Sequence, residues 1–191
     1  MESLESTINR LQEEIFQKQK ALALLIKSQE PERIQNYAFK NTENEPVHLL
    51  DLFEGKDELV LIHNMGKSCV YCTMWADTLS GSYPIIKNRV KIVLTTPDDV
   101  PEMLEFSNSR HWKIPCFSYY GTDFSVDLGF ASDKEGRRCY EPGFSILTQK
   151  DGKIFRTAKD RFGPGDVYCA PWHLFELLPK SLDGWHPKYK Y

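Results

Sequence analysis

Two cysteines separated by two residues, Cys69 and Cys72, are the side chains of this sequence best suited to covalent chemistry. They follow an apolar run at residues 58–64 and a short break, and they begin a helical pattern. At the first turn of a helix, free backbone N–H groups and the helix dipole stabilise a thiolate, and Lys67 adds a positive charge nearby. We therefore expect the Cys69 thiolate to attack a disulfide, and Cys72 to resolve the mixed disulfide that forms.

The same spacing of two cysteines also occurs in zinc sites. Zinc is normally held by four ligands, but the other candidate ligands are scattered and include no second close pair: Cys116, Cys139, Cys169, His63, His111, His173 and His186. Three interpretations of the pair follow, in order of preference: redox chemistry, an inert or degenerate module with reduced thiols, and a structural metal clip. We expect neither a metal nor a cofactor in the site.

His63 lies within the apolar run that precedes the cysteines. It is either a core histidine that donates a hydrogen bond to a backbone carbonyl or the group that accepts a proton from Cys72 during resolution. The residue type and its position favour neither role over the other.

The elements that must position these residues follow from hydrophobic periodicity. The expected elements are, in chain order, a small hairpin at 37–53, a strand at 58–64, a helix from 69 to 79 that resumes to 88, a strand at 90–95, a helix from 98 or 99 to 111, a turn-rich section at 113–129, a hairpin of 144–148 and 154–157, and a helix at 167–178. Alternating strands and helices of this kind predict an α/β fold with a central mixed sheet flanked by helices.

An amphipathic helix precedes this pattern, because apolar residues recur every three or four positions from residue 3 to about 28. We expect three parts: the N-terminal helix at 1–34, a domain at 35–180, and a C-terminal tail at 181–191 that is either frayed or covers the core edge. The helix either packs on its own domain, which is the preferred interpretation, or pairs with its copy in a homodimer. Its near-heptad spacing suits pairing, although Lys18 interrupts the seam.

Composition excludes several classes of protein. A hydrophobic fraction of 41% and a charged fraction of 27% in 191 residues are those of a globular chain, and a net charge of −3 argues against nucleic-acid or anionic-membrane binding. No apolar run approaches the roughly 20 residues of a membrane span. Acidic residues stand where a signal peptide is basic, and five scattered cysteines form no disulfide framework. We expect a cytoplasmic protein whose partner is a protein disulfide or a small-molecule thiol or disulfide.

The stretch ELVLIHNMGKSCVYCTMWAD resembles the active-site strand, turn and helix of the thioredoxin-like superfamily. The preceding YAFKNTENEPVHLLDLFEGK resembles the hairpin found in its peroxiredoxin-like and cytochrome-maturation-type branches. More narrowly, the chain is similar to a bacterial thioredoxin-like family catalogued as a domain of unknown function, through LLDLFEGK, LIHNM, CVYCTMWAD, HWKIPCFSYYGTDFSVDLGF, GKIFRT and WHLFELLP. The resemblance implies a thioredoxin-like fold and thiol-disulfide oxidoreductase activity.

The sequence departs from these families at positions that define their sites. Ser68 stands where thioredoxins have Trp, and His63 stands where they have a buried acid. Ile62 and Gly66 replace the Pro and Thr with which peroxiredoxins hold and polarise a peroxide. The resemblance also implies a cis-proline facing the cysteines, for which Pro142 is the candidate, as a substrate-positioning residue. Two alternatives therefore remain: an atypical thiol peroxidase, and a non-catalytic thioredoxin-like binding module.

Overall fold

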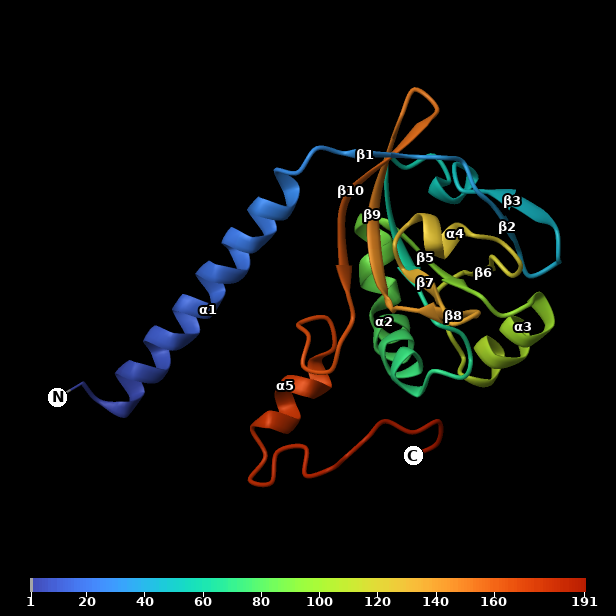
Figure 1. Ribbon diagram of the computed structural model, residues 1–191. Helices are drawn as coiled ribbons and strands as arrows, with labels where there is room; N and C mark the ends of the chain where they lie inside the picture. Colours follow the sequence, from blue (N-terminus) through green and yellow to red (C-terminus); the bar gives the residue numbers. More distant parts are fainter. Residues whose placement is uncertain (1) are drawn as a thin grey trace.

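The computed structural model describes residues 2–191 as a central mixed sheet with helices on both faces and one projecting helix (Figure 1). The strands of this sheet are β1 (Glu32–Ile34), β2 (Ala38–Lys40), β3 (Pro46–His48), β4 (Glu58–His63), β5 (Lys91–Thr96), β6 (Cys116–Ser118), β9 (Gly143–Lys150) and β10 (Lys153–Arg161). A separate hairpin joins β7 (Ala131–Lys134) and β8 (Arg137–Tyr140). The helices are α1 (Leu4–Lys27), the 3-10 helix η1 (Asp51–Phe53), α2 (Val70–Arg89), α3 (Val100–Ser109), α4 (Phe124–Asp127) and α5 (Ala170–Glu176).

β4 lies inside the sheet, parallel to β5 and antiparallel to β9, in the strand order β1-β10-β9-β4-β5-β6-β2-β3. Its run of apolar residues suits this place because both faces are covered: Leu59 and Leu61 face one core and Ile62 faces the other. His63 ends the strand opposite Gly143 of β9. The expected α/β fold, with a mixed sheet flanked by helices, is confirmed.

Two hydrophobic cores lie on the two faces of the sheet. On one face, α2, α3 and α5 bury a cluster that includes Trp75, Met103 and Trp172. On the other face, η1, α4 and the segment before β7 contribute Phe53, Phe124 and Phe130 to an aromatic cluster. The helix that begins beside the cysteine pair therefore packs on the first face only.

Several short elements differ from the sequence prediction. The section at 113–129, expected to be turns, contains β6 and α4, and the hairpin of β7 and β8 follows it. The helical pattern broken at residue 79 forms one continuous α2, with Pro84 inside it. β1 forms where the sequence pattern indicates no strand, and Arg156 of β10 fixes it by donating from Nε to the Glu32 carboxylate at 3.1 Å. Long-range pairing, rather than local pattern, creates β1.

α1 extends away from the sheet, which corrects the preferred interpretation that it packs on its own domain (Figure 1). Ser3 caps the helix by accepting from the backbone N–H of Ser6 at 3.1 Å, and Lys27 complements the dipole at the other end. None of the residues Leu4–Lys27, all of which the structure describes, is buried. Within residues 2–191, no helix combines the length and apolar character of a membrane span.

The C-terminal tail packs back onto the layer of helices that contains α2. Trp185 meets Phe175 edge-on with ring centroids 4.9 Å apart, and Tyr189 meets Phe106 in the same way at 6.1 Å. Of the two outcomes expected for residues 181–191, the tail covers the core edge.

Gly143 provides a test of the packing where β4 meets β9. A Cβ at this position would lie 2.6 Å from Cε1 of Phe130 and closer still to the backbone oxygen of Asp160. Gly81, in contrast, is exposed in α2 with open space around its Cα. We expect Gly143→Ala to lower the free energy of unfolding by about 2–3 kcal/mol, and Gly81→Ala to raise it by about 0.5–1 kcal/mol. Urea unfolding measures both, and equal effects would contradict the packing described.

Candidate active site around Cys69 and Cys72

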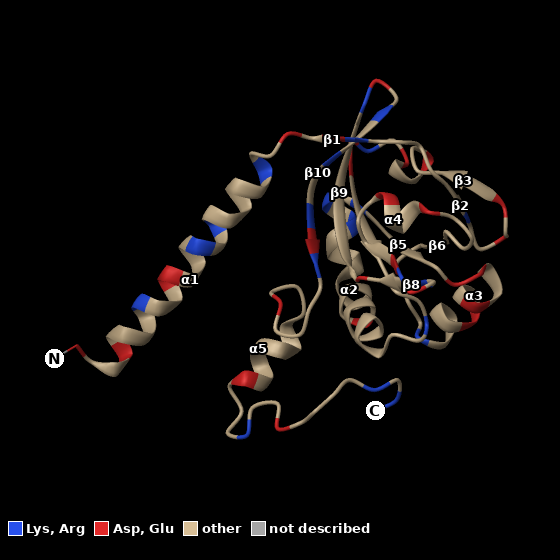
Figure 2. Cartoon of the chain, viewed as in Figure 1, with Lys and Arg blue, Asp and Glu red and all other residues tan. Residues whose placement is uncertain are grey.

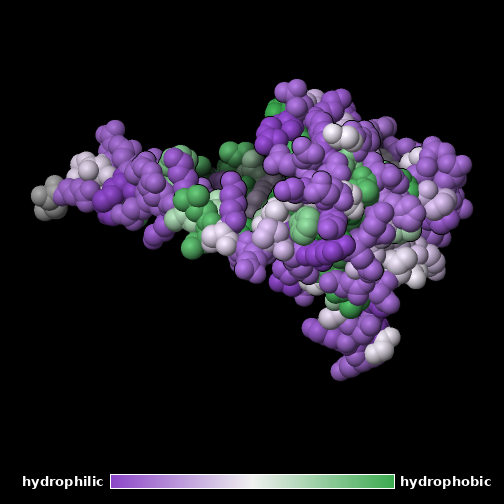
Figure 3. Space-filling view, turned by 90° about the horizontal axis from the view of Figure 1, so that it is seen from above, coloured by the Kyte–Doolittle hydropathy of each residue, from purple (hydrophilic) through white to green (hydrophobic). Residues whose placement is uncertain are grey.

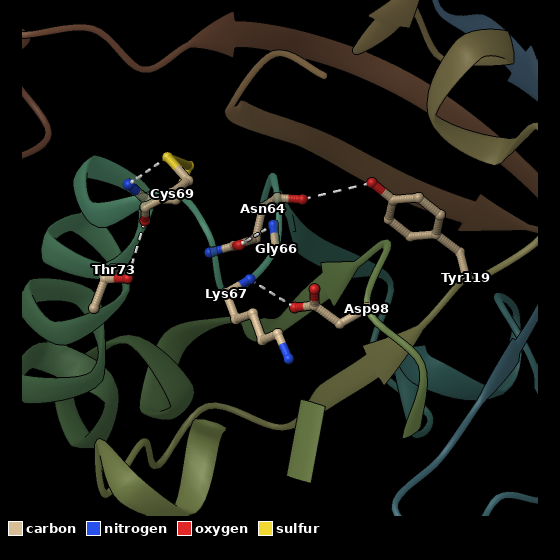
Figure 4. Close-up of a disulfide and its surroundings, with 8 residues drawn as sticks. Asn64, Gly66, Lys67, Cys69, Thr73, Asp98 and Tyr119 are labelled. Carbon is tan, nitrogen blue, oxygen red and sulfur yellow. Dashed lines mark hydrogen bonds between the residues drawn. A yellow bond between two sulfur atoms is a disulfide. The ribbon is translucent and has the colours of Figure 1, made fainter. Parts of the chain in front are cut away.

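Cys69 and Cys72 are joined in a disulfide at the start of α2, with their Cα atoms 5.3 Å apart (Figure 4). Cys69 is the N-cap residue and is half-buried, whereas the side chain of Cys72, one turn into the helix, is only 2% exposed. The backbone N–H of Cys72 points at Sγ of Cys69, 3.1 Å away. In the reduced protein the same N–H is placed to stabilise a thiolate on Cys69. The pair therefore consists of an accessible sulfur and a sheltered one.

The turn before Cys69 is held by side chains that directly follow two neighbouring strands (Figure 4). The side-chain oxygen of Asn64 accepts from the backbone N–H of Gly66 at 2.8 Å. Asp98, just after β5, accepts from the backbone N–H of Lys67 at 2.8 Å and from the Thr96 hydroxyl at 2.8 Å. Because β4 and β5 are parallel neighbours, their C-terminal ends bring these groups together. The geometry of the turn is therefore fixed from both sides.

Gly66 is required at the centre of this turn. Its φ of +95° lies in a region that residues with a side chain rarely adopt, and an added Cβ would lie 2.7 Å from Oδ1 of Asp98. The carboxylate of Asp98 thus occupies the space beside the position where peroxiredoxins have a threonine. The turn offers no hydroxyl at residue 66 to polarise a bound peroxide.

The charges near the pair are largely paired with each other. The ammonium group of Lys67 forms an ion pair with Glu102 of α3, which raises the pKa of Lys67. Burial raises the pKa of the Asp98 carboxyl, and the hydrogen bonds from Thr96 and Lys67 oppose that rise. Lys67 therefore contributes less to the stabilisation of a thiolate on Cys69 than its sequence position suggests.

Tyr71 lies between the two cysteines and links the site to the C-terminal tail. Its hydroxyl is 3.0 Å from Nδ1 of His186, and its ring lies against Trp172 with centroids 6.2 Å apart. Trp75, by comparison, is a core residue, 2% exposed and stacked on Phe162. The tail therefore forms part of the surface next to the pair, a contact that the sequence pattern does not indicate.

His63 is buried on the face of the sheet opposite α2. Its Nε2 lies 2.9 Å from the Ser145 hydroxyl, and its ring stacks on Phe130 with centroids 3.8 Å apart. Burial holds the pKa of His63 well below its ordinary value, and the nearby charges of Arg156 and Lys159 act in the same direction. Among the described residues, no hydrogen bond joins His63 to either cysteine. The hydrogen-bond partner is a hydroxyl rather than the backbone carbonyl expected of a core histidine, and Nδ1 has no partner among the described residues. The position of the ring still favours the core role over proton transfer from Cys72.

Pro142 lies immediately before β9, beside the end of β4. Its carbonyl accepts from the backbone N–H of Phe162 at 2.9 Å. Residues 2–191 contain no cis peptide bond, so the bond before Pro142 is trans, contrary to the expectation that the thioredoxin resemblance implies. Pro142 therefore lies at the end of the sheet where the turn to Cys69 begins. Its peptide bond does not have the cis geometry found in thioredoxins.

The remaining cysteines are separate from the pair. Burial raises the pKa of the Cys116 thiol to about 12, so this thiol is unreactive near neutral pH. Cys169 is buried beside the Thr78 hydroxyl, with Sγ and Oγ1 3.6 Å apart, and Cys139 is half-buried in the hairpin of β7 and β8. Within residues 2–191, no group of three or more His, Cys, Asp or Glu side chains is arranged to hold a metal ion.

Sequence reasoning finds the cysteine pair but misses the residues that fix the turn. Asp98 and Asp99 are equivalent candidates for capping α3, and the structure separates them: Asp99 accepts from the Glu102 backbone N–H at 2.9 Å, while Asp98 turns toward Lys67. Tyr119 is 3.5 Å from the Asn64 carbonyl. Its YYGTDF segment is distinctive in the sequence, but its pattern does not show that it contacts this turn.

Comparisons with known proteins agree with this fold. The model of a family described as "Bacterial protein of unknown function (DUF899)" matches residues 4–185. None of the curated proteins matches the sequence.

Solved structures with a similar fold include several peroxiredoxins. The peroxidoxin BcpB from Mycobacterium tuberculosis has a TM-score of 0.58 and 13% identity, over 69% of this chain and 84% of that one. Reduced Prx3 from Vibrio vulnificus has a TM-score of 0.58 and 14% identity, over 73% and 90%. A peroxiredoxin-like protein from Aquifex aeolicus has a TM-score of 0.53 and 12% identity, over 69% of this chain and 74% of that one. At these identities the likeness establishes the fold alone, which is thioredoxin-like.

Gly66→Ala tests the turn, with Gly55→Ala as its matched control. Both glycines have positive φ, but only Gly66 has a neighbour, Asp98, in the space that a Cβ would fill. Gly55→Ala should lower the free energy of unfolding by about 1 kcal/mol, and Gly66→Ala by about 2 kcal/mol or more, since Asp98 must also shift. Gly66→Ala should also change the alkylation rate of reduced Cys69. If the two variants are equally stable and Cys69 reacts as before, Asp98 does not hold the turn.

The buried His63 predicts a pH dependence of stability. Because its pKa is depressed in the folded state, the unfolded chain binds more protons than the folded chain below about pH 6.5. This residue alone should therefore lower the free energy of unfolding as pH falls through about 6.5, with a slope that approaches about 1.4 kcal/mol per pH unit below it. Urea unfolding of wild type and His63→Asn between pH 7.5 and 5 isolates its contribution. Equal slopes for the two proteins would show that His63 titrates normally when folded.

Proposed function

Since this chain belongs to the family described as bacterial protein of unknown function (DUF899), we propose its function from its site: thiol-disulfide exchange at Cys69 and Cys72. The observation that carries the proposal is the asymmetry of the pair. Cys69 is half-buried at the N-cap of α2, with a backbone N–H directed at its sulfur, and Cys72 is sheltered behind it. An exchange enzyme needs this combination of an accessible nucleophile and a protected resolving thiol.

The reaction begins with the reduced protein. The Cys69 thiolate attacks one sulfur of a substrate disulfide, forming a mixed disulfide and releasing the other substrate sulfur as a thiolate, which takes up a proton. Cys72 then loses its proton and attacks Sγ of Cys69. This step releases the second substrate sulfur and leaves the Cys69–Cys72 disulfide, so two electrons pass from the protein dithiol to the substrate. An external thiol then reduces the protein disulfide, and the whole sequence can also run in reverse.

The proposed substrate is a disulfide of a protein or of a small-molecule thiol. Either can react, because the substrate needs to reach only Sγ of Cys69, the more exposed sulfur of the pair. Pro142, beside the end of β4, is proposed to position the substrate next to Cys69. For His63 we favour the core role, since its ring is engaged by Ser145 and Phe130. We propose the cytoplasm as the location, because the five cysteines are scattered along the sequence and form no disulfide framework of the kind that secreted proteins use.

A second candidate is a thiol peroxidase, which the peroxiredoxin-like fold favours. In that reaction the Cys69 thiolate takes one oxygen from a hydroperoxide to form a sulfenic acid, releasing an alcohol or water. Cys72 condenses with the sulfenic acid to give water and the same disulfide. The residues at the peroxiredoxin Pro and Thr positions, Ile62 and Gly66, provide no hydroxyl for this step. Exchange is therefore the preferred function.

Reduction of insulin disulfides, with dithiothreitol as the electron donor, tests the exchange reaction. We expect Cys69→Ser to reduce the rate to that of dithiothreitol alone, because the nucleophile is lost. Cys72→Ser should accumulate a mixed disulfide with the substrate, visible as an added mass on Cys69. Cys139→Ser, which removes a free half-buried thiol away from the pair, should retain the wild-type rate and serves as the control.

Consumption of hydrogen peroxide, measured on the same proteins, separates the alternatives. Insulin reduction that depends on Cys69, with little peroxide consumption, supports exchange. Fast peroxide consumption without insulin reduction would establish the peroxidase instead. A wild-type protein with neither activity would contradict both and leave a binding module with this fold.

A further inference from the structure

α1 is a long helix whose apolar side chains lie in solvent. Leu4 is 79% exposed, Ile15 57% and Leu25 67%, and the other apolar residues on the same side are exposed to a similar degree. Figure 3 shows hydrophobic patches on the arm formed by this helix, among hydrophilic residues. Only residues 28–31 separate α1 from β1, which is paired with β10 in the sheet. The helix therefore leaves the sheet edge at a fixed point, with its apolar side uncovered.

The apolar residues of α1 form a regular heptad seam. Spacings of four and three residues alternate along the whole helix, and one seam position is a lysine: Leu4, Ile8, Leu11, Ile15, Lys18, Leu22 and Leu25. Such a seam is what one helix of a coiled coil presents to another. A single exposed helix with this seam is incomplete, because these side chains are normally buried against a partner helix.

The charges of α1 are separated along its length. The half that spans residues 4–15 has Glu5, Glu13 and Glu14 against Arg10, whereas the half that spans residues 16–27 has lysines and no acid: Lys18, Lys20 and Lys27. Figure 2 shows this distribution along the projecting helix. Two such helices attract each other when they run in opposite directions and repel each other when they run in the same direction.

We propose that α1 pairs with α1 of a second copy of this chain, in antiparallel orientation. One register aligns the seam from Ile8 to Leu25 and leaves only Leu4 beyond it: Ile8 lies opposite the partner's Leu25, Leu11 opposite the partner's Leu22, and Ile15 opposite the partner's Lys18. Lys18, opposite the partner's Ile15, then also lies beside the partner's Glu14. The pairing is independent of the redox chemistry, since Cys69 lies in the body of each copy and not on α1.

Lys18 determines the orientation. In a parallel pair in register, two Lys18 side chains would meet at one core layer, and the acidic halves would lie side by side, which is unfavourable. In the antiparallel pair each Lys18 keeps its aliphatic stem against Ile15 and its ammonium group near a carboxylate of the partner. The lysine that interrupts the apolar seam thus selects against the parallel arrangement.

Sedimentation equilibrium of the full chain tests the pairing. We expect a dimer for wild type, and for Leu11→Glu a dissociation constant at least about tenfold higher. The matched control is Gln17→Glu, which places the same side chain on the helix but outside the seam, and it should remain dimeric. Because none of α1 is buried in one chain, near-UV circular dichroism should show both variants folded. A monomeric wild type, or a dimer unaffected by Leu11→Glu, would overturn the proposal.

Charge reversal and cross-linking test the orientation. Glu14→Lys and Lys18→Glu should each weaken the dimer, and the double variant should restore it. Oxidation of Ile8→Cys alone should give no covalent dimer through residue 8, whereas a mixture of Ile8→Cys and Leu25→Cys should give one, identified by peptide mass. A covalent dimer through residue 8 of both copies would establish a parallel pair and overturn the orientation proposed.

Discussion

The carboxylate of Asp98 is the fixed point on which the candidate site depends. It accepts from the backbone N–H of Lys67, is bonded by the Thr96 hydroxyl, and fills the space beside Gly66. Burial of the carboxyl is unfavourable for its charged form, and these hydrogen bonds offset that cost. Because Asp98 follows β5 and the turn follows β4, the parallel pairing of these strands sets the position of Cys69.

The turn places Cys69 at the N-terminus of α2, where the helix interacts directly with its sulfur. Cys69 caps α2, so its sulfur receives a backbone N–H that has no partner within the helix, and Cys72 is buried one turn later. The same fold in peroxiredoxins places a threonine in this turn, whereas here residue 66 is a glycine beside a carboxylate. The absence of a hydroxyl at this position is the reason that we propose exchange rather than peroxide reduction.

The sequence predicts the parts of the structure that local pattern determines. The apolar run of β4, the helix after Cys69 and the strand β5 are indicated by periodicity, and the α/β class follows from them. The thioredoxin-like fold is implied by the resemblance of the segment around the cysteines. β1 depends on pairing with β10, which is distant in the sequence, so its short pattern does not reveal it. The hairpin of β7 and β8 is local, but its strands are mostly polar and carry no alternating apolar pattern. The role of Asp98 is hidden for the same reason, because its neighbour Asp99 has the same side chain. The periodicity of α1 predicts a helix but not its exposure.

The reduction potential of the Cys69–Cys72 couple tests the central claim most directly. The protein would be equilibrated in graded glutathione and dithiothreitol buffers, and its free thiols would be trapped with iodoacetamide and counted by mass spectrometry. A redox-active pair predicts a reversible two-electron transition at these two residues, between roughly −270 and −200 mV. If no buffer in the series forms a disulfide between Cys69 and Cys72, the pair is not a redox couple and the proposed exchange reaction is wrong.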